Sequence, residues 1–374
     1  MVLKVKMKNG YYLYSTINSA GVEKKINMQC GVFGKTYNIK TLLIPSKTNN
    51  LFNKIIRRLP FFGVGFEYNK IYKYIVEPDF LYIRKITLDS SFIRFLKKIK
   101  KEYPSCKIIL ELYTFPYFKD AYCRSFKHFL VQFPFALKDY VNSKKIKKYV
   151  NRIVTFSRDD YIFGIKTIKT TNGVDTHNVT MRQCFETNDD IVIISVAYMQ
   201  PHHGFERLID GISIYRNSGG KRKIKYYVIG NGPEKKNYID MVKKLNLEEC
   251  VFFVGEKKGK ELEYYYNIAD IALGSLGGYK IGINLFSSLK IYEYLSKGIP
   301  ILSGCEINIK DDNHCPYVCF FENDSTPIDL NKVINYLDEL YTDNKESLTK
   351  RIREYGIKHV DINACMKDII DYLE

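Results

Sequence analysis

The chain has 374 residues, and 45% of them are apolar. This length exceeds an ordinary single-core domain, and the apolar content can fill two cores, so we expect two folded domains rather than disorder. The net charge of +17 is uneven, because residues 1–175 carry 33 Lys and Arg against 12 Asp and Glu, while residues 176–374 carry 25 against 29. The basic half suggests an anionic partner, such as a membrane surface, a phosphorylated lipid, an acidic polysaccharide or nucleic acid; the alternative is a solvated basic face.

Targeting signals and metal motifs are absent from the sequence pattern. The nine cysteines are scattered and odd in number, which argues against a disulfide framework and favours a reducing cytoplasm. His314, Cys315 and Cys319 cluster without a second ligand pair, so we interpret them as a loop before a strand rather than a zinc site. The N-terminus lacks the apolar core of a signal peptide, and no run approaches the roughly 20 apolar residues of a membrane span. We expect a soluble, cytoplasmic protein, or one that lies on a membrane.

The first half alternates short β-rich runs with helical periodicity. Apolar, β-branched and aromatic residues predict strands over residues 11–14, 40–45, 80–84, 107–112 and 152–156. Between them, Phe92, Phe95, Leu96 and Ile99 share one face of a helix over 91–101, which Asp89, Ser90 or Ser91 could cap. This alternation predicts parallel βαβ units with helices on both faces of a sheet.

A turn over residues 170–175 and a polar stretch over 186–190 mark the domain boundary, where the charge also changes sign. We therefore expect an N-terminal domain over residues 1–176 and a C-terminal domain over 188–355. Residues 356–374 are expected to form a C-terminal helix that could pack back towards the first domain.

The second half repeats the alternation more clearly. Strands are predicted over 191–196, 225–230, 251–255 and 271–273 and from 301, and helices over 204–215, 233–245, 260–267, 288–297, 329–341 and 344–374. The predicted fold class is α/β, with two Rossmann-like, doubly wound domains that face each other across a cleft. In such sheets ligands bind beyond the carboxyl ends of the strands.

The richest segment for chemistry is residues 280–300. On a helix that begins near Ser288, Lys290 and Glu293 are neighbours in the first turns. Free N–H groups at a helix N-terminus and a lysine can bind a diphosphate. A carboxylate one turn later can accept hydrogen bonds from both hydroxyls of a ribose. The alternative is an exposed helix with an ordinary ion pair.

This segment resembles the donor-site signature of GT-B glycosyltransferases, in the family 4 (group 1) enzymes of bacterial polysaccharide synthesis. It reads Ser-x-Leu-Lys-x-x-Glu-Tyr-Leu-x-x-Gly-x-Pro from Ser287. The resemblance gives Glu293 the ribose and Lys290 the diphosphate. Many relatives carry a second Glu eight residues earlier, where this chain has Leu285.

Three further segments carry the resemblance. Residues 196–209 are similar to the strand, loop and helix that open the second domain, with Tyr198 and His203 where many members have Arg and Lys. Residues 230–234 resemble a Gly-x-Gly-Pro turn near the nucleotide base, and residues 172–175 the interdomain Asn-Gly-Val-Asp. The donor site implied comprises Glu293, Lys290, Gly204, Gly230, Gly232, Lys280, Gly282, Ser288 and Leu289.

The first domain resembles the family more diffusely. Residues 19–26 look like its glycine-rich loop and first helix, and residues 111–117 like a Glu-Leu-Pro-Thr-Tyr-Pro-Tyr segment of related polysaccharide enzymes. An acceptor or phosphate loop is implied at Gly21, Val22, Lys25, Thr114 and Tyr117. The implied catalytic set is Lys290, His203 and Glu111. Residues 50–66 mix basic and apolar side chains, which suits contact with an anionic bilayer or packing inside the domain.

The resemblance implies a retaining glycosyltransferase that moves a sugar from a UDP- or GDP-sugar to a saccharide or lipid-linked acceptor in surface polysaccharide synthesis. It implies no cofactor and no essential metal, and no nucleic-acid motif is recognised. Two alternatives stay open: another GT-B chemistry, such as a nucleotide-sugar 2-epimerase, and a non-catalytic, basic polyanion-binding protein on a degenerate transferase scaffold.

Overall fold

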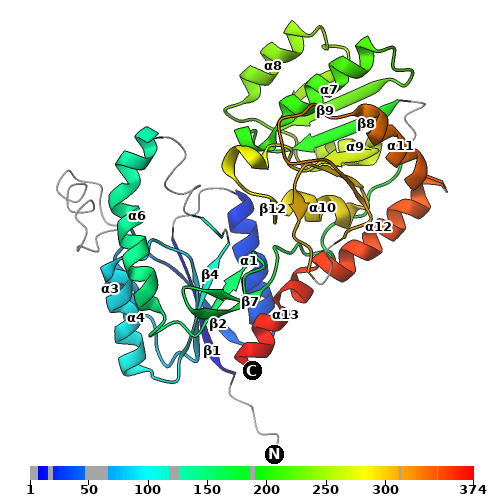
Figure 1. Cartoon of the computed structure of the whole chain (residues 1–374). Coiled ribbons are helices and arrows are strands. Elements are labelled where there is room, and N and C mark those ends of the chain that lie inside the picture. Colours follow the sequence, from blue (N-terminus) through cyan, green and yellow to red (C-terminus); the bar gives the residue numbers. More distant parts are fainter. Residues whose placement is uncertain are drawn as a thin grey trace, which may run out of the picture. The chain divides into compact units, whose positions relative to one another are not determined.

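The computed structural model describes residues 7–15, 20–46, 66–113, 115–117, 126–185, 190–310, 314–342 and 344–374 (Figure 1). The chain divides into two compact units. Unit 1 runs to Thr171 and includes Cys365–Glu374, and unit 2 is Asn172–Ala364. The division falls a few residues before the predicted end of the first domain at 176.

Unit 1 is built on a sheet whose described strands are ordered β2-β1-β3-β4-β5-β7-β6. All neighbours are parallel except β6 and β7. The strands are β1 (Asn9–Tyr14), β2 (Asn38–Leu43), β3 (Phe80–Arg84), β4 (Lys107–Leu112), β5 (Arg152–Thr155), β6 (Tyr161–Ile162) and β7 (Ile165–Lys169). The central strands β3 and β4 are almost wholly buried, which explains their continuous apolar runs, because helices cover both faces of a parallel sheet.

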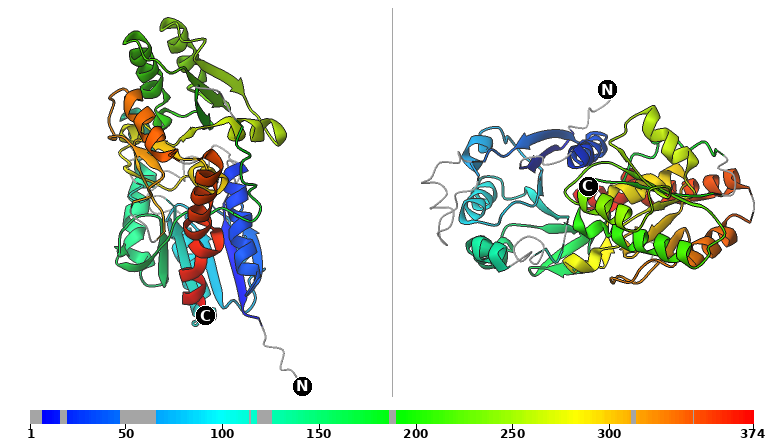
Figure 2. Two further views of the ribbon diagram at one scale, coloured as in Figure 1. Left: turned by 90° about the vertical axis from the view of Figure 1, so that its right-hand side faces the viewer. Right: turned by 90° about the horizontal axis from the view of Figure 1, so that it is seen from above.

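Two layers of helices cover this sheet. The layer on one side contains α3 (Tyr68–Tyr72), α4 (Ser90–Glu102) and α6 (Phe126–Ile146) (Figure 1). On the other side lies α1 (Ala20–Gly34), with the end of α13 (Ile362–Leu373) beside it (Figure 2). Of the three predicted caps, Asp89 is the N-cap of α4, and its carboxylate accepts a hydrogen bond from the backbone N–H of Phe92 at 2.9 Å. Lys107 on β4 donates to the carbonyl oxygen of Tyr372 at 2.7 Å, which ties the C-terminal segment to unit 1.

Unit 2 contains a fully parallel sheet in the order β10-β9-β8-β11-β13-β15. The strands are β8 (Ile191–Val196), β9 (Ile224–Ile229), β10 (Val251–Gly255), β11 (Ile271–Leu273), β13 (Ile301–Ser303) and β15 (Val318–Phe320). Numbered within the unit, this is the order 3-2-1-4-5-6 of a dinucleotide-binding Rossmann fold. A small separate sheet pairs β12 (Leu285–Phe286) with β14 (Glu306–Ile307).

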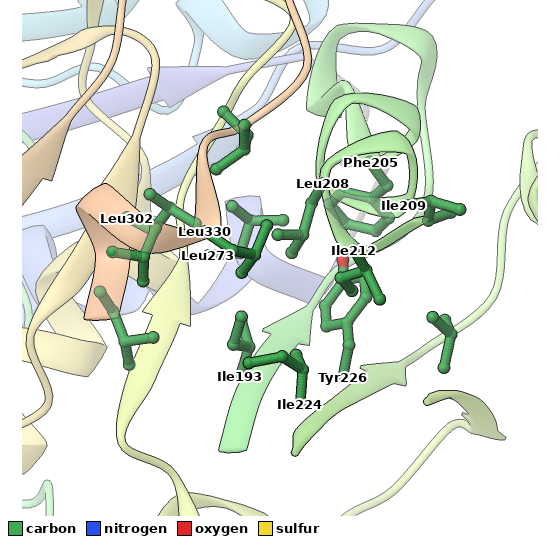
Figure 3. Close-up of a cluster of buried hydrophobic side chains, with 14 of the residues drawn as sticks. Ile193, Phe205, Leu208, Ile209, Ile212, Ile224, Tyr226, Leu273, Leu302 and Leu330 are labelled. Carbon is green, nitrogen blue, oxygen red and sulfur yellow. The ribbon is translucent and has the colours of Figure 1, made fainter. Parts of the chain in front are cut away.

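The helices of unit 2 are α7 (Phe205–Asn217), α8 (Lys235–Lys244), α9 (Lys260–Ile268), α10 (Leu289–Lys297), α11 (Leu330–Leu340) and α12 (Lys345–Val360). Short 3-10 turns occupy Pro201–His203 and Gly278–Ile281. Figure 3 shows how α7 buries Phe205, Leu208 and Ile212 against the sheet, where they meet Ile193 and Tyr226. This core fixes the first turn of α7, and therefore the loop that leads into it.

One sequence prediction of secondary structure is corrected. The single helix predicted over 344–374 is two helices, α12 and α13, because Asp361 between them has an extended backbone. Its carboxylate accepts hydrogen bonds from the Thr176 hydroxyl at 2.6 Å and from the backbone N–H of Asn363 at 2.9 Å, and so caps the next helix. The strands β6 and β7 were not predicted.

Candidate functional site

Two loops of unit 2 meet beyond the carboxyl ends of adjacent strands. Strand β8 is followed by the loop 197–204, and its neighbour β11 by the loop 274–282. The chain proceeds from β8 towards β9 on one side and later returns to β11 on the other, so the strand order reverses between β8 and β11. In open α/β sheets this reversal creates the crevice in which ligands bind.

Glycines bring these two loops into backbone contact. Gly204 has a left-handed backbone with φ 64°, and a Cβ atom placed on it would lie 2.5 Å from the backbone nitrogen of Gly277. Next to this contact, the backbone N–H of Leu276 donates to the carbonyl oxygen of His203 at 2.9 Å. The Ser275 hydroxyl donates to the carbonyl oxygen of His202 at 2.6 Å. Only glycine fits at position 204, so the predicted role of Gly204 includes shaping this contact.

A buried arginine stabilises the loop 274–282 through hydrogen bonds to backbone carbonyl oxygens. Arg207 on α7 is 1% exposed, and its guanidinium donates to the carbonyl oxygens of Leu276 at 2.7 Å and Thr326 at 2.6 Å. It also pairs with Asp324 at 3.2 Å. Sequence analysis gave Arg207 no role. The available signal was a charged residue directly before the apolar pair Leu208 and Ile209.

Lys290 enters the site from the first turn of α10. Its ammonium donates to the carbonyl oxygen of Gly274, at the end of β11, at 2.7 Å and lies 5.9 Å from the centre of the Phe205 ring. Burial lowers the pKa of Lys290 to about 7. Helix α10 is held against the sheet by Tyr294, whose hydroxyl oxygen accepts a hydrogen bond from the backbone N–H of Val196, at the end of β8, at 2.9 Å. The predicted cation is therefore in place, but it gains or loses its proton near neutral pH.

His203 lies near Lys290, and both side chains approach the ring of Phe205. Its Nδ1 accepts a hydrogen bond from the backbone N–H of Gln200 at 3.1 Å, so the neutral ring carries its proton on Nε2. The ring stacks on Phe205 with centres 5.5 Å apart. Burial lowers the pKa of His203 far below its usual range, and the charges of Lys290 and His202 act in the same direction. His203 is therefore a neutral Nε2–H donor.

Two further predicted glycines shape the neighbouring loop after β9. A Cβ atom on Gly230 would lie 2.0 Å from the carbonyl oxygen of Ala197, and one on Gly232 2.4 Å from the backbone nitrogen of Met199. Both glycines have positive φ, at 126° and 147°. The Gly-x-Gly turn therefore packs directly against the loop that follows β8.

The other predicted donor residues border this region. Ser288 is the N-cap of α10, with no hydrogen bond from its side chain to the helix, and Leu289 is half-buried in the first turn. Glu293 is half-buried one turn after Lys290, and its charge adds to the burial that raises the pKa of Tyr266.

Two of the predicted donor residues, Lys280 and Gly282, stabilise the local structure of the loop 274–282. Lys280 forms an ion pair with Glu206 on the first turn of α7. Gly282 ends the 3-10 turn over Gly278–Ile281 with φ 68°. The ammonium of Lys280 is therefore engaged by a carboxylate, whereas that of Lys290 donates to a backbone carbonyl oxygen.

The predicted residues of unit 1 fall into two clusters. Glu111, at the end of β4, is 0% exposed, and its carboxylate accepts hydrogen bonds from Lys25 at 2.8 Å, Gln29 at 2.9 Å, Tyr82 at 2.6 Å and Arg84 at 3.1 Å. Burial alone would raise the pKa of Glu111, but the charges and hydrogen bonds of these partners outweigh it and lower the pKa to about 2. A carboxylate so occupied suits a charge anchor better than a proton-transfer group.

The second cluster of unit 1 is formed around Tyr117. Its hydroxyl bonds to Asp139 on α6, and the Lys85 ammonium lies 3.3 Å from its ring centre. Of the other predicted acceptor residues, Gly21 is exposed and Val22 is half-buried in the first turn of α1. Thr114 and most of the stretch 50–66 lie outside the described residues. Tyr117 is thus held among charged groups apart from the Glu111 cluster.

Comparisons with known proteins were made after this geometry. Residues 179–359 match the family model described as glycosyl transferases group 1. A search of curated proteins finds no match. Among solved structures, a glycosyltransferase from Rickettsia africae ESF-5 is similar with TM-score 0.62 and 13% identity, covering 98% of each chain. Anabaena Alr3699/HepE in complex with UDP gives TM-score 0.63 and 13% identity, covering 98% of this chain and 99% of that one. At these identities the likeness shows the fold alone.

Proposed function

Because residues 179–359 match the glycosyl transferases group 1 family model and the chain has the GT-B fold, we propose that this protein is a retaining, metal-independent glycosyltransferase. It takes a sugar from a UDP- or GDP-sugar and passes it to a saccharide or lipid-linked acceptor in surface polysaccharide synthesis. The family match and the GT-B neighbours support glycosyl transfer from a nucleotide-sugar donor. The retaining course, the acceptor and the pathway are our proposal.

One observation carries the proposal. At the strand-order reversal of unit 2, a glycine contact between two loops is combined with a half-buried lysine and a neutral histidine. A diphosphate matches these groups, because Lys290 supplies positive charge and His203 Nε2–H supplies a directed donor. Solved structures of Alr3699/HepE hold UDP, UDP with glucose, and UDP-glucose, which agrees with this ligand class.

The proposed chemistry follows from the charge that develops on the leaving diphosphate. Lys290, His203 Nε2–H and the N-terminus of α10 stabilise that charge, and Glu293 accepts the ribose hydroxyls. The leaving phosphate oxygen takes the proton of the attacking acceptor hydroxyl on the same face of the sugar. No protein nucleophile is then needed, and Glu111, with four donors on its carboxylate, anchors Lys25 and Arg84 rather than attacking.

The proposed acceptor binds to unit 1. At the carboxyl ends of β3 and β4, Arg84 and Lys85 are only 13% exposed in their side chains, and each is paired with a carboxylate. The ring of Tyr113, 43% exposed, lies 4.4 Å from the Arg84 guanidinium. An aromatic ring beside a cation suits a sugar that carries a phosphate. The excess of positive charge in residues 1–175 also supports contact with an anionic membrane at its cytoplasmic face.

Thermal unfolding with a panel of UDP- and GDP-sugars, without metal and with a chelator, tests the donor site. A donor at about 100 times its dissociation constant stabilises the fold by about 2.7 kcal/mol, so the matching nucleotide should raise the melting temperature clearly. Glu293→Ala should lose most of this rise, whereas Glu339→Ala, an exposed glutamate on α11, should keep it. If no nucleotide sugar raises the melting temperature, the proposal is wrong. NMR of the product then reports whether the anomeric configuration is retained.

A further inference from the structure

The outer face of α6 in unit 1 is apolar although it is exposed. Six large apolar side chains of this helix are between 38% and 59% exposed: Leu130, Val131, Phe133, Leu137, Tyr140 and Val141. Apart from Val131, each lies three or four residues from another member of the set, so they form one stripe along the helix. With Lys144 the stripe spans about 21 Å at 1.5 Å per residue. A surface helix normally turns such a stripe towards the core.

Four polar side chains of α6 face inward. Lys138, Asp139, Asn142 and Ser143 are at most 5% exposed. Asp139 accepts a hydrogen bond from the backbone N–H of Leu88 at 2.9 Å, and Asn142 donates to the carbonyl oxygen of Leu88 at 3.0 Å. These bonds fix the rotation of the helix about its axis. Turning α6 to bury its apolar stripe would break them and expose the ion pair between Asp139 and Lys85.

The charges around the stripe are almost all positive. Lys144 and Lys145 are exposed in the last turn of α6, and Lys144 lies over the Tyr140 ring, 4.7 Å from its centre. The next helix in the layer, α4, packs against α6 (Figure 1). Its exposed cations are Arg94, Lys97, Lys98 and Lys101, against the single acid Glu102. Two copies paired through this layer would bring these like charges together, which disfavours a second copy as the occupant.

We propose that the outer face of α6 docks on an anionic lipid surface. The apolar stripe lies in the plane of the membrane at the boundary between head groups and acyl chains, and the lysines contact lipid phosphates. Within the described residues no helix is long and apolar enough to span a bilayer, and the stripe needs none, because it binds from one side. The inference deepens the proposed function, on which it rests for the membrane-bound acceptor, by naming the docking surface.

The chain contains no Trp, so a single introduced Trp reports its own environment without background. Tyr140→Trp places this probe in the stripe, and Tyr264→Trp places it on α9 of unit 2 at a tyrosine that is 53% exposed. With vesicles of phosphatidylcholine and phosphatidylglycerol in equal parts, the emission of Tyr140→Trp should shift to the blue and be quenched by brominated lipid. The emission of Tyr264→Trp should not change.

Matched variants separate the two parts of the surface. In the Tyr140→Trp background, Lys144→Gln with Lys145→Gln should weaken vesicle binding about 25-fold, since each lysine contributes roughly fivefold. Leu130→Asn with Leu137→Asn should abolish the blue shift. Ile214→Asn, 57% exposed on α7, should leave binding unchanged.

Four results would overturn the inference. They are an emission of Tyr140→Trp that is already blue-shifted without vesicles, no shift with vesicles, equal binding to pure phosphatidylcholine, and self-association that Leu137→Asn abolishes. Donor binding is scored on the same samples by the thermal shift with nucleotide sugars. Vesicle binding without a nucleotide-sugar shift would refute the transferase proposal and leave the docking surface, whereas the reverse result would refute only the surface.

Discussion

The protonation of Lys290 should set the affinity for the sugar donor around neutral pH. Burial lowers the pKa of this lysine to about 7 in the free protein. About nine-tenths of the molecules then carry the charge at pH 6 and about one-tenth at pH 8. If the bound diphosphate keeps Lys290 charged throughout this range, the dissociation constant should rise about tenfold from pH 6 to pH 8, or about 1.4 kcal/mol.

Isothermal titration calorimetry with an intact nucleotide sugar is the suitable assay, because its diphosphate is substituted at both ends and does not titrate near neutrality. At pH 7, titrations in buffers of different ionisation enthalpy should show uptake of about half a proton on binding. Lys290→Arg should bind with a flat pH profile, because the guanidinium stays charged. His203→Gln should weaken binding but keep the slope, since His203 is already neutral. A flat profile in the wild type, or the same slope in Lys290→Arg, would refute the reasoning.

Three other variants test the loop contact of unit 2 and the Glu111 cluster of unit 1. Gly204→Ala should lower the free energy of unfolding by about 2 kcal/mol or more, from its left-handed backbone and the contact with Gly277, and should weaken donor binding; urea unfolding followed by circular dichroism measures it. Arg207→Lys should cost about 2–4 kcal/mol in the same assay, because buried carbonyl oxygens lose their donors. Because the pKa of Glu111 is lowered from 4.5 to about 2, its charged carboxylate stabilises the fold at pH values above 4.5. The free energy of unfolding should therefore fall as the pH drops from about 4.5 towards 2. Glu111→Gln should lose this acid dependence and about 3 kcal/mol at pH 7, because Lys25 stays buried without its counter-charge.

The strands of both sheets were the most predictable part of the fold. The bounds predicted for β3, β4, β8 and β11 agree with the structure, because parallel strands buried on both faces read as continuous apolar runs that end abruptly. The strand β7 was missed for the opposite reason. It lies next to the edge of the sheet with Lys166 and Lys169 exposed, so its apolar residues alternate with charges in a short, turn-rich stretch.

The helix α6 shows a second limit of sequence patterns. Its apolar periodicity faces solvent while Asp139 and Asn142 face inward, so a rule that turns apolar stripes towards the core gives the wrong rotation. Pro134 also interrupts its sequence, although the structure keeps it inside the helix. The hydrogen bonds to Leu88 and the burial of these polar side chains show which face is covered.

The motif of the proposed donor site was recognisable in the sequence, but the spatial arrangement of its residues was not. Sequence analysis named Lys290, His203 and Gly204, and the structure places Lys290 and His203 around one aromatic ring, directly beside the glycine contact. It could not supply the hydrogen bond that fixes the tautomer of His203, because that bond comes from a backbone N–H. Sequence analysis also missed Arg207, which supports the loops of unit 2, and Gln29 and Arg84, which bind Glu111 in unit 1. The partners of a buried charge depend on the fold and cannot be identified from the sequence.

The departures from the family pattern explain why so much should depend on Lys290. Tyr198, in a position where many relatives carry a basic residue, is 64% exposed and brings no charge. His203, in the other such position, is neutral. Lys280 is already paired with Glu206, which offsets its charge. Among the proposed donor residues in the described part of unit 2, Lys290 therefore supplies most of the positive charge available to a diphosphate. Burial lowers the pKa of this lysine to about 7, so its charge changes near neutral pH. At high pH, a bound diphosphate must cause Lys290 to take up a proton before the two can form an ion pair. Donor binding and proton uptake should therefore be coupled at this site.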